Sequence, residues 1–276
     1  MSLESPSADL LARVRFVLVE PSHPGNIGGV ARAMKTMGLS RLALVKPEVF
    51  PSAEATARAS GADDVLYHAA LFADLPAAVA DCVLAVGTSA RGRTLEWPEL
   101  SPREAAAVLL EAAARGPVAV AFGRESSGLT NAEMERCQHL LRIPANPEYS
   151  SLNLAAAAQV VAYELRVAAM AGGSPGGLPR RVPDGLPGGL QGGLHAGPPR
   201  GPEAAPPATA AEMDGLLAHM EETARAIGFL DPAAPRYLMR RLWRLFQRAR
   251  LDRTEVNILR GFLKAVLLAA RRGEGE

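Results

Sequence analysis

The stretch IPANPEYSSLNLAAAAQVVAYELRVA, from Ile143 to Ala168, decides how the rest of the sequence is interpreted. Its first residue is the last of a short apolar run. Two prolines follow, which cannot continue a helix, and then a long Ala-rich helical segment. Ser150, Ser151 and Asn153 precede that segment, where side-chain oxygens accept hydrogen bonds from the unpaired N–H groups of a first helical turn. One such residue is enough to cap a helix. Two serines and an asparagine within four positions therefore indicate a turn that holds a ligand.

Short apolar runs alternate with helical patterns through residues 1–171. The apolar runs are Val14–Val19, Leu42–Val45, Val65–Tyr67, Cys82–Val86, Val118–Phe122 and Leu140–Ile143. Amphipathic or Ala-rich stretches such as Ala53–Ala59 and Pro102–Arg115 lie between them. Buried strands that alternate with helices are typical of a mostly parallel sheet covered on both faces. The sequence therefore predicts an α/β domain over residues 1–171.

The composition changes sharply after this domain. More than half of residues 172–207 are Gly or Pro, so they are predicted to form a linker that buries too little apolar surface to order itself. Helical periodicity returns in residues 208–276, at Ala208–Gly228, Arg236–Arg248 and Asp252–Arg272. These residues are expected to form a small helical extension.

Charge is distributed unevenly although the net charge of the chain is only +1. Residues 236–272 hold eleven Lys or Arg and two acidic residues, a local balance of +9, so the remainder of the chain sums to −8. Four arginines recur at three- and four-residue spacing and share one helix face, namely Arg240, Arg241, Arg244 and Arg248. A solvated helix face explains a short basic run, but a segment this basic on an otherwise acidic chain favours a phosphate-binding surface.

Other bulk features limit the classes of protein to consider. Cys82 and Cys137 are far apart in apolar surroundings and are predicted to be buried thiols. No apolar run approaches the ~18 residues of a membrane span, and the N-terminus has no signal-peptide pattern. The five histidines lack ligand spacing, so no metal site is expected. We expect a cytoplasmic protein without a membrane segment.

Three further polar loops follow predicted strands. The segment Ser22–Gly29 contains His23, Asn26 and three glycines and leads into a helix with Arg32. The other two loops are Gly87–Arg91 and Gly123–Asn131. Glycines at such turns permit close backbone approach to a ligand. Because open α/β sheets bind ligands at the carboxyl ends of their strands, all four polar turns are predicted to converge at one edge.

Ordinary structural roles explain part of this chemistry. A lone histidine such as His23 is more often a hydrogen-bonded loop residue than a catalytic base. Arg124 stands beside Glu125 and is in position for a structural ion pair. Thr130 with Glu133, and Asp252 with Glu255, have the spacing of capping boxes at the start of a helix. The chain has no GxGxxG and no GxxxxGK[ST], and no nucleophile elbow follows a predicted strand.

Three motifs together resemble the SPOUT superfamily of RNA methyltransferases. They are SHPGNIGGVARAMKTMGL from Ser22, FGRESSGLTNAE from Phe122 and IPANPEYSSLNLAAAAQVVAYE from Ile143. A fourth match, RLFQRARLDRTEVNILRGFL from Arg244, is similar to the helical extension of the TrmJ branch, which comprises tRNA 2′-O-methyltransferases acting in the anticodon loop. The resemblance covers nearly the whole chain except the linker.

The resemblance implies a SPOUT fold, in which the C-terminal part of an α/β sheet forms a trefoil knot. It also implies S-adenosylmethionine bound in the knot and a homodimer whose helix after Asn153 packs against the partner subunit. By position, the residues that bind the cofactor are expected to be Thr88, Ser89, Ala90, Gly123, Ile143, Ser150, Ser151 and Leu152. The residues that match the catalytic positions are Asn26, Arg32, Ser151 and Asn153.

The implied reaction is methyl transfer to the ribose 2′-hydroxyl of nucleotide 32 in tRNA, with cytidine or uridine as the base. Arg32 is expected to bind the adjacent phosphate and stabilise developing negative charge, since a guanidinium stays protonated in proteins. Two alternatives remain. One is a catalytically inactive RNA-binding protein of the same fold, and the other is a nucleotide-dependent dehydrogenase, against which the missing Gly fingerprint argues.

Overall fold

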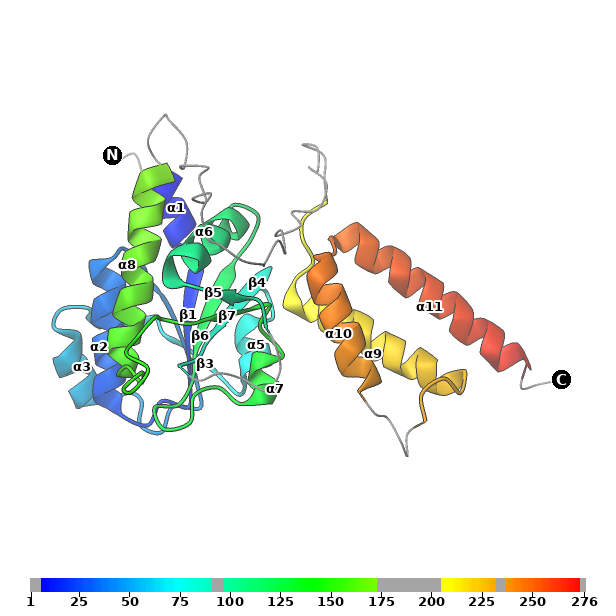
Figure 1. The fold of residues 1–276 in the computed structure, drawn as a ribbon, viewed down its shortest axis with the longest axis horizontal. Coiled ribbons are helices and arrows are strands. Elements are labelled where there is room, and N and C mark those ends of the chain that lie inside the picture. Colours follow the sequence, from blue (N-terminus) through cyan, green and yellow to red (C-terminus); the bar gives the residue numbers. More distant parts are fainter. Residues whose placement is uncertain (1–5, 91–96, 173–204, 232–236, 274–276) are drawn as a thin grey trace. The chain divides into compact units, whose positions relative to one another are not determined.

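The computed structural model describes residues 6–90, 97–172, 205–231 and 237–273 (Figure 1). The chain divides into two compact units, residues 1–176 and residues 177–276. Most of the predicted linker, residues 173–204, lies outside the described residues, as does Arg91 of the second polar loop.

The first unit is built on a seven-stranded sheet with the order β3-β2-β1-β6-β4-β7-β5. Its strands are β1 (Val14–Val19), β2 (Arg41–Val45), β3 (Ala70–Phe72), β4 (Leu84–Thr88), β5 (Glu99–Leu100), β6 (Val118–Phe122) and β7 (His139–Leu141). Every described strand pair is parallel. In the centre, Phe16 lies opposite Leu42 on one side and Val120 on the other. The predicted parallel α/β sheet is confirmed.

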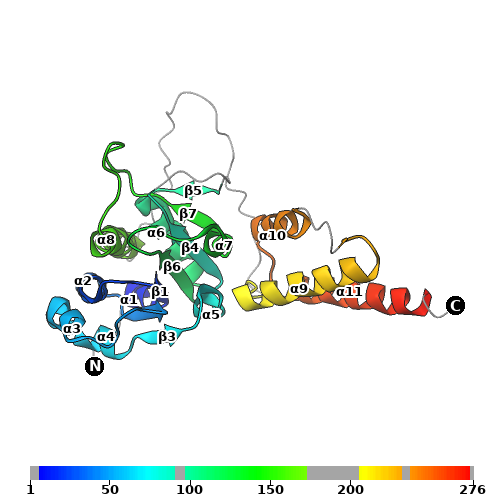
Figure 2. The ribbon, with the colours of Figure 1, turned by 90° about the horizontal axis from the view of Figure 1, so that it is seen from below.

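Helices cover both faces of this sheet, as Figure 2 shows. The helices are α1 (Pro6–Leu11), α2 (Pro24–Thr36), α3 (Ala53–Ala59), α4 (Asp63–Tyr67), α5 (Leu75–Val79), α6 (Pro102–Ala113), α7 (Asn131–Met134) and α8 (Leu154–Gly172). Helix α8 packs between α2 and α6 on one face, whereas α5 lies against the strands on the other. Both cysteines are buried as predicted, and burial raises the pKa of the Cys82 thiol to about 12.

Two short elements differ from the sequence prediction. The apolar triplet Val65–Tyr67 was expected to be a strand but belongs to α4, and the strand follows it as β3. Three apolar residues fit a helix as well as a strand, and here Asp63 and Asp64 occupy the first turn, where acidic side chains interact favourably with the helix dipole. Strand β5 has only two residues and produces no period-2 pattern.

Helix α8 is the long Ala-rich segment of the opening stretch. Its core-facing side is a regular helical stripe of Leu154, Ala158, Val161, Ala162, Leu165 and Ala169. By length and composition, Leu154–Ala171 would also pass as a membrane span. The prediction that no apolar run reaches that length is therefore wrong for this helix, although its contacts with α2 and α6 make it a core helix of the sheet.

The glycines of the first polar loop have a packing role rather than a ligand role. They lie inside α2, and a Cβ at Gly28 would come within 2.1 Å of the Ala55 carbonyl oxygen on α3. A Cβ at Gly29 would come within 2.8 Å of Ala155 Cβ on α8. The interpretation that these glycines permit approach of a ligand is wrong, because neighbouring helices occupy that space.

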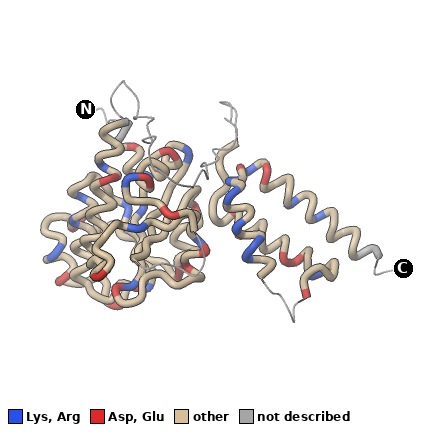
Figure 3. The backbone as a smooth tube through the Cα atoms, viewed as in Figure 1, with Lys and Arg blue, Asp and Glu red and all other residues tan. Residues whose placement is uncertain are grey.

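The second unit contains α9 (Ala210–Ala226), α10 (Leu238–Ala249) and α11 (Arg253–Gly273). Helices α9 and α11 pack together around Met213, Leu216, Val256 and Leu263. The Asp252–Glu255 capping box is present, with both hydrogen bonds at 2.8 Å. Helix α10 has no fully buried residue, and Figure 3 shows basic residues along it.

Candidate functional site

The four polar turns meet at one edge of the sheet, as predicted. Strands β1, β6, β4 and β7 are neighbours and parallel, so their carboxyl ends lie together. A pocket of about 310 Å³ opens at this edge. It is lined by all eight predicted cofactor positions, Thr88, Ser89, Ala90, Gly123, Ile143, Ser150, Ser151 and Leu152, together with loop residues 124–128.

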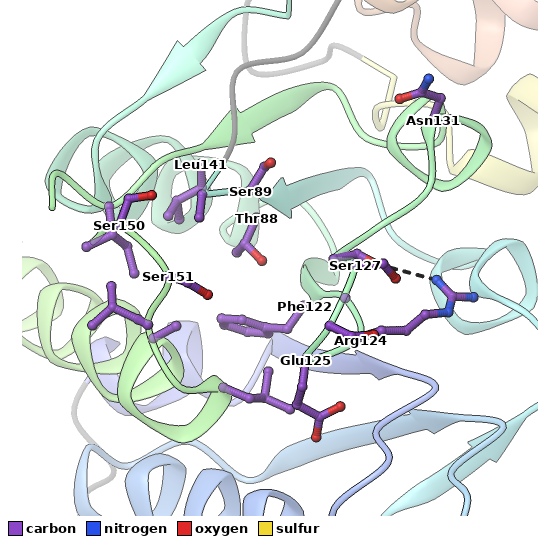
Figure 4. Close-up of a pocket in the computed structure, with 18 residues that line it drawn as sticks. Thr88, Ser89, Phe122, Arg124, Glu125, Ser127, Asn131, Leu141, Ser150 and Ser151 are labelled. Atoms are coloured by element: carbon purple, nitrogen blue, oxygen red, sulfur yellow. Dashed lines mark hydrogen bonds between the residues drawn. The ribbon is translucent and has the colours of Figure 1, made fainter. Parts of the chain in front are cut away.

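The pocket wall combines hydroxyl groups with apolar side chains. Figure 4 shows Thr88, Ser151 and Phe122 around a common space, while Arg124 and Glu125 extend away from it in different directions. Apolar surface comes from Phe122, Leu141, Ile143, Leu152 and Leu154. Such a wall suits a ligand with a flat apolar part and several polar groups.

Gly123 is required by the shape of the loop that forms one wall. A Cβ at this position would lie 2.1 Å from the backbone carbon of Gly128 and 2.1 Å from the nitrogen of Leu129. Gly128 itself has a φ of +72°, in the left-handed region that glycine adopts without strain. Both glycines therefore allow the 123–128 loop to fold back on itself, and the capping box between Thr130 and Glu133 follows directly.

Asn153 connects the start of α8 to the first polar loop. Its Oδ1 accepts from the backbone N–H of Ala155 at 2.9 Å, so it caps the helix. Its Nδ2 donates to Oδ1 of Asn26 at 2.9 Å. The structure thus brings together two predicted catalytic residues that are separated by more than a hundred positions, while neither lines the pocket itself.

Glu125 completes this connection and was missed by the sequence analysis as a site residue. Its carboxylate accepts from Nδ2 of Asn26 at 2.8 Å and from the N–H and hydroxyl of Ser22 at 3.1 and 3.0 Å. Partial burial acts to raise the pKa of Glu125, but these hydrogen bonds outweigh it and the pKa is lowered. The only indication in the sequence was an acidic residue within one of the converging loops.

Arg124 does not form the ion pair with Glu125 that its position suggested. Its Nε donates to Glu20 at 2.7 Å, and its two terminal nitrogens donate to both oxygens of Glu133 at 2.9 and 3.0 Å. Arg124 and Glu125 are adjacent but reach different partners, since the carboxylate of Glu125 accepts from Asn26 and Ser22 instead.

Arg32 lies on α2 one turn beyond Gly28 and is exposed. Its side chain makes no hydrogen bond or ion pair with any residue that the structure describes. A cation without a partner among those residues is available for an anionic ligand. His23, in contrast, has the ordinary loop role, because its Nδ1 accepts from the N–H of Gly25 and so caps α2.

Comparison with known proteins shows similarity over most of the chain. Residues 13–163 match the model of the SpoU rRNA Methylase family, and residues 211–275 match the C-terminal domain of the tRNA methyltransferase TrmJ. A tRNA (cytidine/uridine/adenosine-2′-O-)-methyltransferase TrmJ from Pseudomonas aeruginosa is 48% identical over 264 residues, covering 95% of this chain and 96% of the relative. The cytidine/uridine enzyme TrmJ of Pectobacterium atrosepticum is 46% identical, covering 93% and 98%.

Solved structures give the same result for the fold. The crystal structure of TrmJ from Z. mobilis ZM4 superposes with a TM-score of 0.73 at 31% identity, covering 91% of this chain and 98% of that one. The chain therefore belongs to the SpoU methylase family and, within it, to the TrmJ methyltransferases. It is an enzyme that transfers methyl groups, which removes the dehydrogenase alternative. The trefoil knot stays a prediction.

Proposed function

We propose that this protein uses S-adenosylmethionine to methylate the ribose 2′-hydroxyl of nucleotide 32 in the anticodon loop of tRNA, with cytidine or uridine as the base. One observation carries the proposal. All eight expected cofactor positions line the same pocket, and Asn26 and Asn153 are hydrogen-bonded to each other beside it. The names of the Pseudomonas and Pectobacterium relatives support the tRNA and the 2′-oxygen.

The residues of the pocket fit S-adenosylmethionine. Its adenine would lie against the apolar side chains of Ile143, Leu141 and Leu152, and its polar groups would meet the hydroxyls of Thr88 and Ser151. The volume of about 310 Å³ is within the range of pockets for small cofactors. When bound, the cofactor supplies an electrophilic methyl group, so the protein has to place and activate the ribose hydroxyl.

Arg32 is the residue best suited to activate that hydroxyl indirectly. Its exposed guanidinium can bind the neighbouring phosphate and stabilise negative charge that develops on the 2′-oxygen. Asn26 is held between Asn153 and Glu125, which fixes its side chain in one orientation. We assign Asn26, Asn153 and Ser151 to orienting the nucleotide.

Arg32→Ala is expected to lower the single-turnover rate of tRNA methylation by about 10²- to 10³-fold, because a preorganised charge at the reacting oxygen is removed. The measurement uses saturating tRNA and maps the product as a 2′-O-methyl group at nucleotide 32. Binding of S-adenosylhomocysteine should not change. The control is Lys35→Ala on the same helix, since Lys35 donates to Gly61 and Asp64 and should leave the rate unaltered. A wild-type rate in Arg32→Ala would refute its role.

We also propose that α8 forms a homodimer interface. Opposite its core-facing stripe, Tyr163, Val167 and Met170 are 52%, 39% and 62% exposed. Their spacing of four and three residues puts them on one helix face. Exposed large apolar side chains in a continuous stripe are typical of a protein–protein contact. A second copy of this chain presents the same uncharged, apolar stripe, so the two stripes can pack against each other across a two-fold axis.

Tyr163→Glu is expected to shift the protein from dimer to monomer, because it places an unpaired charge within an apolar contact. Sedimentation velocity at one fixed protein concentration measures the change. Tyr67→Glu is the matched control, since Tyr67 on α4 is 86% exposed and lies away from the stripe. Dimers in both variants, or monomers in both, would contradict the assignment.

The second unit is proposed to dock on tRNA through α10. Arg240, Arg241, Arg244 and Arg248 lie on one face of this helix and are all exposed. The guanidinium of Arg240 also lies over the exposed ring of Tyr237 at 5.9 Å. Arginines that alternate with aromatic residues suit an RNA backbone with unstacked bases.

Replacing these four arginines by glutamine is expected to weaken tRNA binding and to make log K less dependent on log salt. The slope should fall by about 0.7 to 0.9 for each phosphate that the protein no longer neutralises. Fluorescence anisotropy over a salt series measures the slope. Binding of S-adenosylhomocysteine, measured in parallel, should stay at the wild-type value. An unchanged salt slope, or equal weakening in both titrations, would contradict docking through α10.

A further inference from the structure

Two residues at equivalent places in the sheet have a backbone conformation that favours glycine. Glu20 directly follows β1 with a φ of +47°, and Lys46 directly follows β2 with a φ of +44°. Each donates its N–H to the next strand, Glu20 to Val45 at 2.8 Å and Lys46 to Phe72 at 3.2 Å. A residue with a side chain is strained in this region. The backbone alone therefore gives no reason for glutamate at position 20.

The side chain of Glu20 has a specific use that the side chain of Lys46 lacks. Its carboxylate accepts from Nε of Arg124 at 2.7 Å, across more than a hundred residues of sequence. The side chain of Lys46 is exposed and forms no hydrogen bond or ion pair within the described part of the chain. Glu20 and Lys46 therefore share a backbone conformation, but only Glu20 uses its side chain for a contact within the described part of the chain.

Arg124 is held on its other side by Glu133 at the start of α7. The two terminal nitrogens of Arg124 donate to the two carboxylate oxygens at 2.9 and 3.0 Å. The exposed fractions of the two side chains are 21% and 17%, so the pair is shielded from water better than an ordinary surface pair. Glu133 also accepts from the N–H of Thr130, which fixes it in the capping box.

These contacts end at the loop that forms one wall of the pocket. The backbones of Arg124 and Gly128 exchange hydrogen bonds at 3.3 and 2.8 Å, closing the loop over residues 124–128. The residue after Arg124 is Glu125, which accepts from Asn26 at 2.8 Å. The position of Arg124 therefore determines both the wall and the orientation of a proposed catalytic residue.

We propose that Glu20, Arg124 and Glu133 form a positioning clamp that holds the loop of residues 123–128 in the shape that binds the cofactor. The inference rests on the proposed function, because it assigns the pocket to S-adenosylmethionine. None of the three carries out chemistry on the substrate. The clamp acts through the loop. It restricts the conformations of the loop before the cofactor binds, so that binding costs less conformational entropy.

The charge-assisted hydrogen bonds among Glu20, Arg124 and Glu133 favour a rigid arrangement. Hydrogen bonds that Arg124 donates to Glu133, and then to Glu20, raise the pKa of Arg124 above its ordinary value. A bidentate pair between a guanidinium and a carboxylate fixes direction as well as distance. Lysine at position 124 would keep the charge but could not contact two carboxylates in this planar geometry.

The test compares Glu20→Gly with the matched control Lys46→Gly in the full-length chain. Both changes relieve the same backbone strain, but only the first breaks the clamp. Glu20→Gly is expected to weaken binding of S-adenosylhomocysteine by about tenfold in calorimetry, as the loop becomes less preorganised, while its unfolding temperature does not fall below the wild-type value. Lys46→Gly should bind like the wild type. Equal affinity in both variants overturns the clamp.

Hydrogen exchange in the ligand-free protein gives a second, independent measurement. Amides of residues 123–131 should exchange faster in Glu20→Gly and Arg124→Lys than in the wild type and in Lys46→Gly. If the wild type does not bind S-adenosylhomocysteine, the proposed function fails, and this exchange pattern still decides whether the clamp exists. Unaltered exchange in both clamp variants overturns it.

Discussion

The hydrogen bond from Asn153 to Asn26 is the constraint on which the site depends. Asn153 caps the start of α8 and Asn26 belongs to the first turn of α2, so the bond joins two helices that also pack closely at Gly29 and Ala155. Glu125 extends the same chain of hydrogen bonds to the loop after β6. The first turn of α2, the start of α8 and the loop after β6 are thereby held together beside the pocket.

This arrangement explains why a helix cap can become part of an enzyme site. Asn153 caps α8 through its side-chain oxygen alone. Its side-chain nitrogen is therefore available to donate to Asn26. Ser150 and Ser151 are not needed by the cap and line the pocket instead. The three polar residues of the turn therefore have different roles: Asn153 caps α8 and contacts Asn26, whereas Ser150 and Ser151 line the pocket.

The sequence predicted what depends on neighbouring residues and missed what depends on distant ones. Strand Val14–Val19 and helix Ala53–Ala59 were predicted with their observed bounds, because a short, nearly continuous apolar run fits a buried strand and an Ala-rich stretch fits a helix. The triplet Val65–Tyr67 was too short to distinguish a strand from a helix. Asn26 and Glu20, which contact Glu125 and Arg124, lie about a hundred positions away from them, so no local pattern indicated either contact. The eight pocket positions came from family likeness, and the structure brings them together.

A double-mutant cycle between Asn26 and Asn153 tests the central constraint most directly. Asn153→Ser keeps a capping oxygen for α8 but removes the amide donor, and Asn26→Ala removes the acceptor. In single-turnover methylation of saturating tRNA, each variant is expected to be slower than the wild type. The double variant should be no slower than the slower single variant, because both changes break the same connection. Rate reductions that multiply in the double variant would contradict this account.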